Sequence, residues 1–497
     1  MQKFDIVIIG SGLGGLICGY ILSKEGYNIC IIEKENQLGG CLQTFKRNGC
    51  TFDTGMHYIG SMEEGQTLNR YFKYFGLTDK LNLFRLDENG YDIINYQGED
   101  FAFAQGHDNF VDTLHRKFPK EKKALVDYTN KLKEISSNID LYNLRETPET
   151  PSGNGHFLTI GVHDYLQSIT KDVKLQNVLA GSSPLYAGIR EKSPLYVHAI
   201  INNSFIESAW RFVDGGSQIA NILADRIREN GGTILNKTEV TKIVEQDGLI
   251  KHVIINNSEQ IEASKFISNI HPEKTLSMLD SSMIRKAYRN RISSLENTIG
   301  MFTVYIVLKE NTIKYFNNNI YHYAIDDVWA GPGYRNENWP EGCMILTAPS
   351  KGMGEYTNNL SIITYMRWDE MLPWENTDIE KRGDDYLAFK EKKAQQLIDL
   401  VEKQIPGLKQ SIKTYYTSTP LTYRDYTGTK EGSVYGILKD YNDPIKTLIF
   451  PRTRIPNLLF TGQNTNTHGV LGVTLGAVMT SATITGLNYL IKKINEA

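Results

Sequence analysis

The sequence predicts an α/β fold in which a domain with a parallel sheet is interleaved with a second, α+β domain. Three observations support this prediction: an apolar, β-branched run at the N-terminus, a glycine-rich turn directly behind it, and further glycine-rich segments in the middle and near the end of the chain. The 497 residues, of which 40% are hydrophobic, are enough for two large domains with cores of their own.

Composition and charge exclude several classes of protein. Lys and Arg number 54 against 57 Asp and Glu, so the net charge is −3 and no excess of positive charge is available to bind nucleic acid. The mean hydropathy of −0.35 excludes a polytopic membrane protein. The five cysteines form no CxxC pair, and neither HExxH nor a cluster of His, Cys and Asp occurs, so we expect no metal site.

The first forty residues follow the strand–turn–helix–strand order of a Rossmann-type unit. Asp5–Gly10 and Tyr27–Ile32 are short apolar runs typical of buried parallel strands, and Leu16–Lys24 has helical apolar spacing. A G-x-G-x-x-G turn precedes the helix, and the second strand ends at the acidic Glu33. The turn residues that we expect beside a dinucleotide are Gly10, Gly12, Leu13, Gly14 and Gly15.

Each part of this unit has a physical reason. Gly10 permits the tight turn, Gly12 lets the backbone approach a pyrophosphate, and Gly15 lets the helix lie close to the sheet. Free N–H groups and a partial positive charge at the helix N-terminus favour the phosphates. Glu33 can accept hydrogen bonds from a ribose diol and would repel a 2′-phosphate.

A second glycine pair favours FAD over NAD as the dinucleotide. Gly39 follows Glu33 by six residues, and an NAD-only domain needs no further close approach of the backbone here. FAD is longer, and its ribityl chain does need one. The expected FAD contacts in this stretch are Glu33, Lys34, Gly39, Gly40, Cys41 and Thr44. No second strand–GxGxxG–helix unit occurs, so NAD(P)H or another external reductant would have no dedicated domain.

These motifs resemble those of a flavoprotein family that contains bacterial phytoene desaturases, carotenoid isomerases and animal retinol saturases. The similarity rests on GSGLGG at 10–15, LGGC at 38–41 and FDTGMHYIG at 52–60. It is closest to the retinol saturase branch, because Cys41 stands where phytoene desaturases and amine oxidases usually carry Arg. Further matching segments lie in the middle and at the end, so the resemblance covers the whole chain.

The resemblance implies a discontinuous, Rossmann-type FAD-binding domain of the glutathione reductase and amine oxidase type. This domain would comprise residues 1–70, 205–280 and 420–497, and residues 71–204 and 281–419 would form the α+β substrate domain over the flavin. The further FAD contacts implied by the resemblance are Met56, His57, Val240, Gly462, Gln463, Gly472 and Val473.

The function implied by the resemblance is that of an FAD-dependent oxidoreductase acting on C=C bonds of an apolar isoprenoid, a retinoid- or carotenoid-like polyene. Saturation by hydride transfer from the reduced flavin N5 ranks first. Cis–trans isomerisation and desaturation stay open, because all three reactions share the flavin site. His57 and Tyr58 are the candidate proton donors, and a structural role is the alternative for each.

Two other classes of protein are alternatives. A flavin amine oxidase is weakened by the absence of Arg at position 41 and of a recognisable aromatic cage. A prenyl-binding, escort-like protein would hold an isoprenoid without flavin, and the complete set of flavin motifs argues against it.

The sequence favours a cytoplasmic location. The cysteines are few and odd in number, which fits a reducing compartment, and the N-terminus lacks the pattern of a signal peptide. Peripheral contact with the inner face of the cell membrane is a second expectation, because an apolar polyene dissolves in the bilayer. The uncharged stretch Gly469–Ile491 is long enough to cross a bilayer, but its glycines and threonines favour a buried helix.

Overall fold

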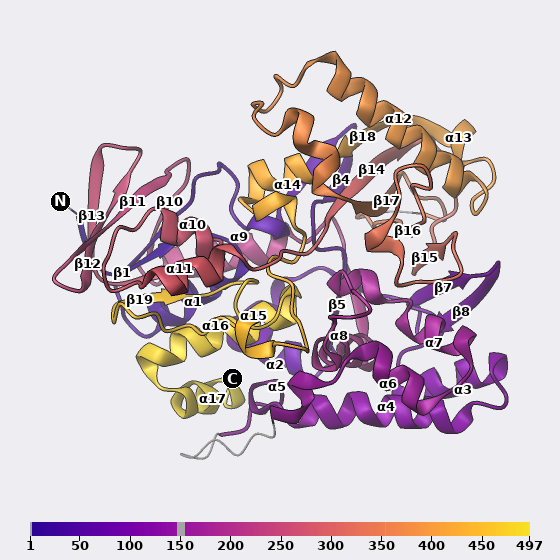
Figure 1. The fold of residues 1–497 in the computed structure, drawn as a ribbon, viewed down its shortest axis with the longest axis horizontal. Coiled ribbons are helices and arrows are strands. Elements are labelled where there is room, and N and C mark those ends of the chain that lie inside the picture. Colours follow the sequence, from indigo (N-terminus) through magenta and orange to yellow (C-terminus); the bar gives the residue numbers. More distant parts are fainter. Residues whose placement is uncertain (1, 147–154, 353) are drawn as a thin grey trace.

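The computed structural model describes residues 2–146, 155–352 and 354–497. It contains two large sheets that lie side by side, with a group of helices beneath the second one (Figure 1). Indigo and yellow segments run together at the left of Figure 1, so the beginning and the end of the chain build one domain.

The first sheet is a parallel sheet with an antiparallel extension. Its strands run in the order β10-β2-β1-β13, and the outer edge of β13 holds β12 along its first residues and β19 along its last. Strand β11 pairs with β12 as a hairpin at the edge. The strands are β1 (Gln2–Ile9), β2 (Ile29–Ile32), β10 (Thr233–Leu235), β11 (Val240–Gln246), β12 (Leu249–Ile255), β13 (Glu259–Ser268) and β19 (Leu458–Phe460).

Strand β1 is buried on both faces, as its apolar run predicts. Ile6 and Ile8 pack into the core beneath the helices, whereas Val7 and Ile9 pack into a separate core on the opposite face, in accordance with the two-residue period of a strand. The covering helices α1, α9 and α16 come from three separate parts of the sequence (Figure 1). Their bounds are α1 (Leu13–Lys24), α9 (Ser217–Glu229) and α16 (Gly469–Thr485).

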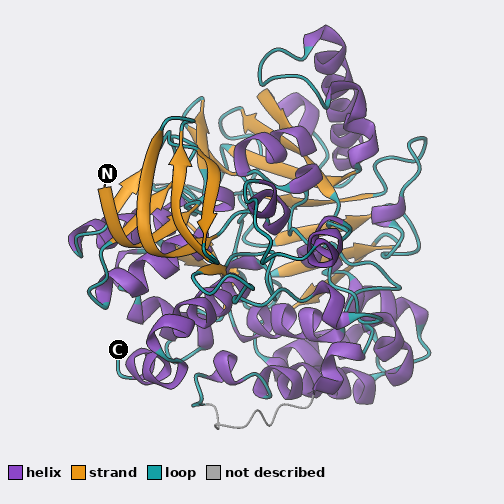
Figure 2. Cartoon of the chain, turned by 60° about the vertical axis from the view of Figure 1, so that its left-hand side comes forward, coloured by secondary structure: helices purple, strands orange, loops and turns teal. Residues whose placement is uncertain are grey.

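The second sheet is mostly antiparallel, in the order β18-β14-β17-β16-β15-β7-β8, and only the β15–β7 pair is parallel among the pairs described. A long helix, α12 (Gly383–Glu402), packs its apolar side on one face through a shared core (Figures 1 and 2). The strands are β7 (Asp92–Tyr96), β8 (Glu99–Phe103), β14 (Gly300–Leu308), β15 (Asn319–Tyr323), β16 (Gly342–Leu346), β17 (Asn359–Met366) and β18 (Ile412–Ser418).

The remaining elements connect the two sheets. A small three-stranded sheet has the order β5-β9-β6, and the hairpin β3–β4 packs on the second sheet through ring contacts of Phe45 and Phe52 with Tyr305. These strands are β3 (Thr44–Arg47), β4 (Cys50–Asp53), β5 (Ile59–Gly60), β6 (Leu83–Arg85) and β9 (Ala209–Phe212). The other helices are α2 (Thr67–Tyr74), α3 (His107–Lys117), α4 (Lys122–Ser137), α5 (Asp140–Asn143), α6 (Val162–Ile169), α7 (Val173–Ala180), α8 (Leu195–Glu207), α10 (Pro272–Ser277), α11 (Lys286–Ser293), α13 (Leu408–Ser411), α14 (Pro420–Thr427), α15 (Pro444–Thr447) and α17 (Leu487–Asn495).

The strands of the first sheet all lie within 1–70, 205–280 and 420–497, and those of the second within 71–204 and 281–419. The hairpin β3–β4 crosses this division, because it belongs to the first segment but packs on the second sheet. The uncharged stretch Gly469–Ile491 is divided at Gly486, whose φ of +96° ends α16. Among the described residues, no helix combines the length and the apolarity needed to cross a bilayer.

Candidate cofactor and substrate site

A cavity of about 1720 Å³ is lined by residues of both sheets and of helix α8. Ordinary ligand pockets measure about 300–1,000 Å³, so this cavity has room for a dinucleotide together with a second molecule. One end is formed by glycine-rich backbone at the carboxyl ends of the parallel strands, where ligands of open α/β sheets bind. The other end is apolar.

The two N-terminal glycine motifs lie against each other at the first end. Gly12 and Gly39 form a parallel bridge, and the Gly39 N–H donates to the Ser11 carbonyl at 3.1 Å. The C-terminal motif joins them, because a Cβ placed on Gly14 would lie 2.9 Å from the backbone nitrogen of Gly462. Three segments that are distant in sequence thus expose bare backbone to one end of the cavity.

Glu33 lines the same end, as its place behind β2 predicts. One carboxylate oxygen accepts from the Ser11 N–H at 2.9 Å and from its hydroxyl at 2.7 Å, and the other accepts from the Glu35 N–H at 2.9 Å. These three bonds fix the carboxylate and leave it acceptor capacity toward the cavity, since an ionised carboxylate has about four acceptor sites.

Most of the predicted cofactor residues line the cavity. They are Gly10, Gly12, Leu13, Gly14, Glu33, Lys34, Gly39, Gly40, Cys41, Met56, His57, Val240, Gly462, Gln463, Gly472 and Val473. Gly15 and Thr44 do not line it. A Cβ on Gly15 would lie 2.2 Å from the Gly10 carbonyl, so this glycine serves the close packing of helix on sheet, and the Thr44 hydroxyl instead bonds that of Ser217 at 3.0 Å.

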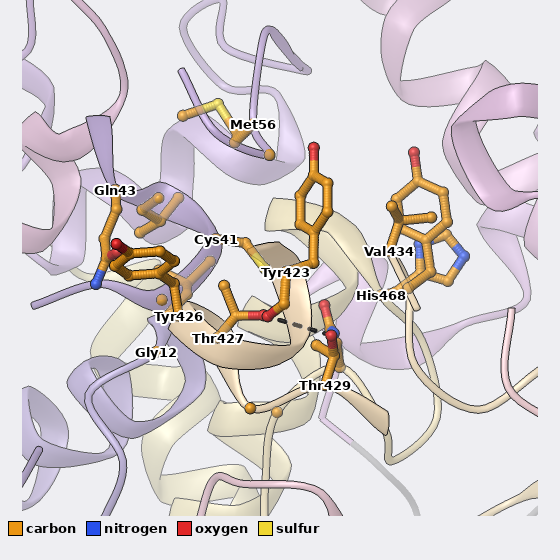
Figure 3. A pocket seen from close by; sticks show the side chains of 18 of the residues that line it. Gly12, Cys41, Gln43, Met56, Tyr423, Tyr426, Thr427, Thr429, Val434 and His468 are labelled. Carbon is orange, nitrogen blue, oxygen red and sulfur yellow. Dashed lines mark hydrogen bonds between the residues drawn. The ribbon is translucent and has the colours of Figure 1, made fainter. Parts of the chain in front are cut away.

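The N-terminus of α16 lines the cavity through Gly472 and Val473. Its unpaired N–H groups and helix dipole would stabilise negative charge there. In Figure 3, Cys41 and Met56 from the N-terminal segment lie around the same space as Tyr423 and His468 from the late part of the chain. Burial raises the pKa of the Cys41 thiol to about 11, so it remains a thiol and packs as a small side chain.

His57 is in the cavity wall, and its Nδ1 is buried without a hydrogen-bond partner among the described protein groups. Burial lowers its pKa to about 4, and the nearby positive charge of Arg211 acts in the same direction. The imidazole is therefore neutral at pH 7, which makes it a hydrogen-bonding group rather than a cationic acid.

The second end of the cavity is apolar. Helix α8 contributes one face with helical spacing, on which Val197, Ile200, Ile201 and Phe205 line the cavity together with the polar Ser204. The Ser204 hydroxyl is occupied, since it donates to the Ile201 carbonyl at 2.8 Å. The other apolar and aromatic residues of this end include Leu68, Met301, Tyr323, Met344, Ile363, Tyr365, Val434 and Tyr435.

Tyr58 and Tyr321 form a hydrogen-bonded polar pair at this apolar end. Their hydroxyls are 2.7 Å apart, and both residues line the cavity. Tyr58 also donates to a carboxylate oxygen of Asp92 at 2.9 Å. Sequence reasoning named Tyr58 but missed its contacts with Tyr321 and Asp92, because these residues lie on separate strands and no local pattern joins them.

This fold and site define a Rossmann-type dinucleotide-binding protein with an adjoining apolar chamber. Comparisons with known proteins agree. Residues 8–75 match the family described as the NAD(P)-binding Rossmann-like domain. The all-trans-retinol 13,14-reductase of Rattus norvegicus is 25% identical over 97% of this chain and 86% of its own length. Prolycopene isomerase 2 of an Oncidium hybrid cultivar is 24% identical over 96% of this chain and 83% of its own length.

Among solved structures, an oxidoreductase from Methanosarcina mazei has a TM-score of 0.64 at 18% identity, covering 96% of this chain and 99% of that one. The fold class predicted from the sequence is confirmed. The relatives also confirm the resemblance found in the motifs, and they agree with the enzyme class that it implied, an oxidoreductase.

Proposed function

We propose that this protein is an FAD-dependent oxidoreductase that acts on C=C bonds of an apolar polyene, with saturation as its reaction. The observation that best supports the proposal is that three glycine motifs and an apolar chamber line one and the same cavity. The similarity to all-trans-retinol 13,14-reductases over nearly the whole chain supports the direction of the reaction.

The residues present fit FAD. Bare backbone at Gly12 and Gly40 suits a pyrophosphate and a ribityl chain, and the fixed carboxylate of Glu33 suits a ribose diol. The N-terminus of α16 suits the part of the flavin that becomes negative on reduction. FAD, when bound and reduced, supplies a hydride equivalent to carbon. NAD(P)H or another external reductant would reduce the oxidised FAD again.

The chamber selects the substrate by excluding charge. The lining face of α8 carries apolar side chains and one serine whose hydroxyl is internally bonded. A charged substrate would lose its hydration here without gaining a partner on this face. An apolar chain would gain about 25 cal/mol for each Å² removed from water.

Isomerisation is the second candidate, because prolycopene isomerases match this chain over a similar span. Product mass separates the two reactions. The purified protein, loaded with FAD and a reductant under anaerobic conditions, is incubated with retinol and with carotenoids. Saturation adds two hydrogens to the product, whereas isomerisation leaves the mass unchanged. A protein that binds no FAD, or that changes no polyene in the panel, would contradict the proposal.

A further inference from the structure

A buried chain of hydrogen bonds runs from the apolar chamber into the second sheet. Tyr321 contacts Tyr58 at 2.7 Å, and Tyr58 donates to Asp92 at 2.9 Å. Behind Asp92, the Asn319 amide donates to the other carboxylate oxygen at 2.7 Å and accepts from Arg211 at 2.5 Å. The chain joins the loop before β5 to strands β7, β15 and β9.

The end members of this chain differ in access to the cavity. Tyr321 and Tyr58 line it, whereas Asp92, Asn319 and Arg211 lie behind them and do not line it, although Tyr321 is itself as buried as Asp92. The charged and titratable groups around Asp92 are Tyr58, Tyr91, Arg211 and Tyr321. Desolvation raises the pKa of Asp92 to about 7, against the lowering by Asn319, Tyr58 and Arg211, so both its charge states are accessible near neutrality.

The number of protons on this hydrogen-bond chain determines whether the Tyr321 hydroxyl can donate a proton into the chamber. With Asp92 ionised, both tyrosine hydroxyls point toward the carboxylate: Tyr321 donates to Tyr58, and Tyr58 donates to Asp92. Protonation of Asp92 adds one proton and permits the reverse order. The acid then donates to Tyr58 and Tyr58 to Tyr321, which frees the Tyr321 O–H to point into the cavity.

We propose that Asp92, Tyr58 and Tyr321 are the proton-delivery chain for saturation of the substrate. This rests on the proposed function, in which reduced FAD supplies the hydride to one carbon of the C=C bond. As the second C–H bond forms, the Tyr321 O–H bond breaks. Tyr321 regains a proton from Tyr58, and Tyr58 regains one from Asp92. The result is a saturated C–C bond, oxidised FAD and an Asp92 carboxylate. After the product leaves, water in the cavity returns one proton to Asp92 through Tyr321 and Tyr58.

Tyr321 is the catalytic acid in this scheme, because it is the chain member at the cavity that gains a free O–H. Tyr58 and Asp92 act through it, and Asn319 and Arg211 are positioning residues. The proposed proton pathway does not use His57, in agreement with the neutral state of the His57 imidazole at pH 7. A concerted shift of the three protons avoids a free tyrosinate, which burial disfavours at both tyrosines.

The first experiment measures the protonation state of Asp92 and its coupling to the tyrosines in the absence of turnover. Infrared difference spectra of the full-length protein are recorded between pH 5 and pH 9, in the wild type, Asp92→Asn and Tyr321→Phe. We expect a carboxylic-acid C=O band that titrates near neutrality, disappears in Asp92→Asn and shifts in frequency in Tyr321→Phe. Tyr96→Phe is the matched control, since the Tyr96 hydroxyl on the same strand as Asp92 bonds the Asp326 carbonyl instead. Absence of such a band in the wild type would overturn the proposal.

The second experiment measures single-turnover saturation by reduced, FAD-loaded protein across the same pH range. We expect the wild-type rate constant to fall above about pH 7, and Tyr321→Phe to lower it by about 10²–10⁴-fold while the half-saturating substrate concentration stays unchanged. Asp92→Asn should lower the rate and flatten the pH profile, and Asp92→Glu should restore part of both. In D₂O the wild type should deuterate one face of the double bond, and Tyr321→Phe should lose this selectivity.

The outcomes separate the two proposals. If the wild type saturates a polyene but the three variants keep its rate, pH profile and facial selectivity, the proton chain is wrong and the proposed function stands. If the wild type binds FAD and saturates no polyene, the proposed function fails, and the assignment of the chain to saturation fails with it. FAD binding by each variant, measured by flavin absorbance, excludes loss of the fold as the cause.

Discussion

Ser11 donates both its backbone N–H and its hydroxyl to one carboxylate oxygen of Glu33, at 2.9 and 2.7 Å. This pair ties the first glycine turn to the acid at the end of β2. We predict that Glu33→Gln lowers FAD affinity by about 10–100-fold, since an amide that keeps its oxygen toward Ser11 presents a donor, and no acceptor, to the ribose. Glu229→Gln makes the same charge change on the surface of α9 and serves as the control in flavin titrations. Equal affinities in the two variants would contradict the role of Glu33.

The contact between the first and last glycine motifs gives a second prediction. A Cβ on Gly14 would lie 2.6 Å from Asn269 Oδ1 and 2.9 Å from the Gly462 nitrogen, so Gly14→Ala must push these segments apart. We expect a loss of about 1–3 kcal/mol of stability and a weaker FAD complex. In Gly333→Ala the new Cβ meets no atom within 4 Å, and the thermal midpoint and the flavin content should stay at wild-type values. A Gly14→Ala protein with unchanged midpoint and flavin content would show that the segments are not in contact.

The buried imidazole of His198 leads to a prediction about the pH dependence of folding stability. Its Nδ1 lies 3.0 Å from the Tyr186 hydroxyl and 3.2 Å from the Asn202 amide nitrogen, and its Nε2 lies 2.8 Å from the Tyr128 hydroxyl, a set that fits a neutral imidazole. Burial lowers its pKa from 6.5 to about 3. The unfolded chain therefore binds a proton that the native state does not, so the stabilisation is complete above pH 6.5 and is lost as the pH falls toward 3.

At pH 5 this loss amounts to about 2 kcal/mol. We expect the fall in thermal midpoint from pH 7 to pH 5 to be smaller in His198→Asn than in the wild type, whatever the offset between them at pH 7. Scanning calorimetry at both pH values measures it. Parallel pH dependence in the two proteins would mean that His198 is protonated in the native state.

The apolar face of α8 gives a prediction on substrate size. Ile200 is buried and lines the chamber, so Ile200→Trp should narrow it and raise the KM for long polyenes by at least tenfold while FAD affinity stays unchanged. Ile200→Val removes one methylene, worth about 0.8 kcal/mol of apolar burial, and should change the KM by about fourfold. Initial rates with a short and a long polyene provide the measurement. An equal effect of Ile200→Trp on both substrates would place Ile200 away from the chain-binding path.

The cofactor end of the site was predictable from the sequence, and the chemistry of the substrate end was not. Gly12, Glu33 and Gly39 lie within thirty residues of one another, and each belongs to a local pattern with a fixed structural consequence. Asp92 and Tyr321 come from β7 and β15, which pair in the second sheet, and Arg211 comes from β9 of the small three-stranded sheet, so their juxtaposition depends on long-range pairing and packing.

Thr44 shows that the position of a side chain can escape prediction even when the residue lies close to a recognised motif. It follows the glycine pair closely in sequence, but β3 turns away from the cavity toward Ser217. The direction of that hairpin is set by the packing of Phe45 and Phe52 on Tyr305, a contact more than 250 residues away in sequence. Long-range packing of this kind leaves no local pattern to read.

The most direct test of the central claim is a stopped-flow experiment under anaerobic conditions. Protein carrying reduced FAD is mixed with all-trans-retinol, and the oxidised-flavin and polyene absorbances are recorded together. Oxidised flavin should appear at the rate at which polyene absorbance is lost, with one C=C bond saturated per flavin. Flavin that stays reduced while the polyene is isomerised or unchanged would contradict it.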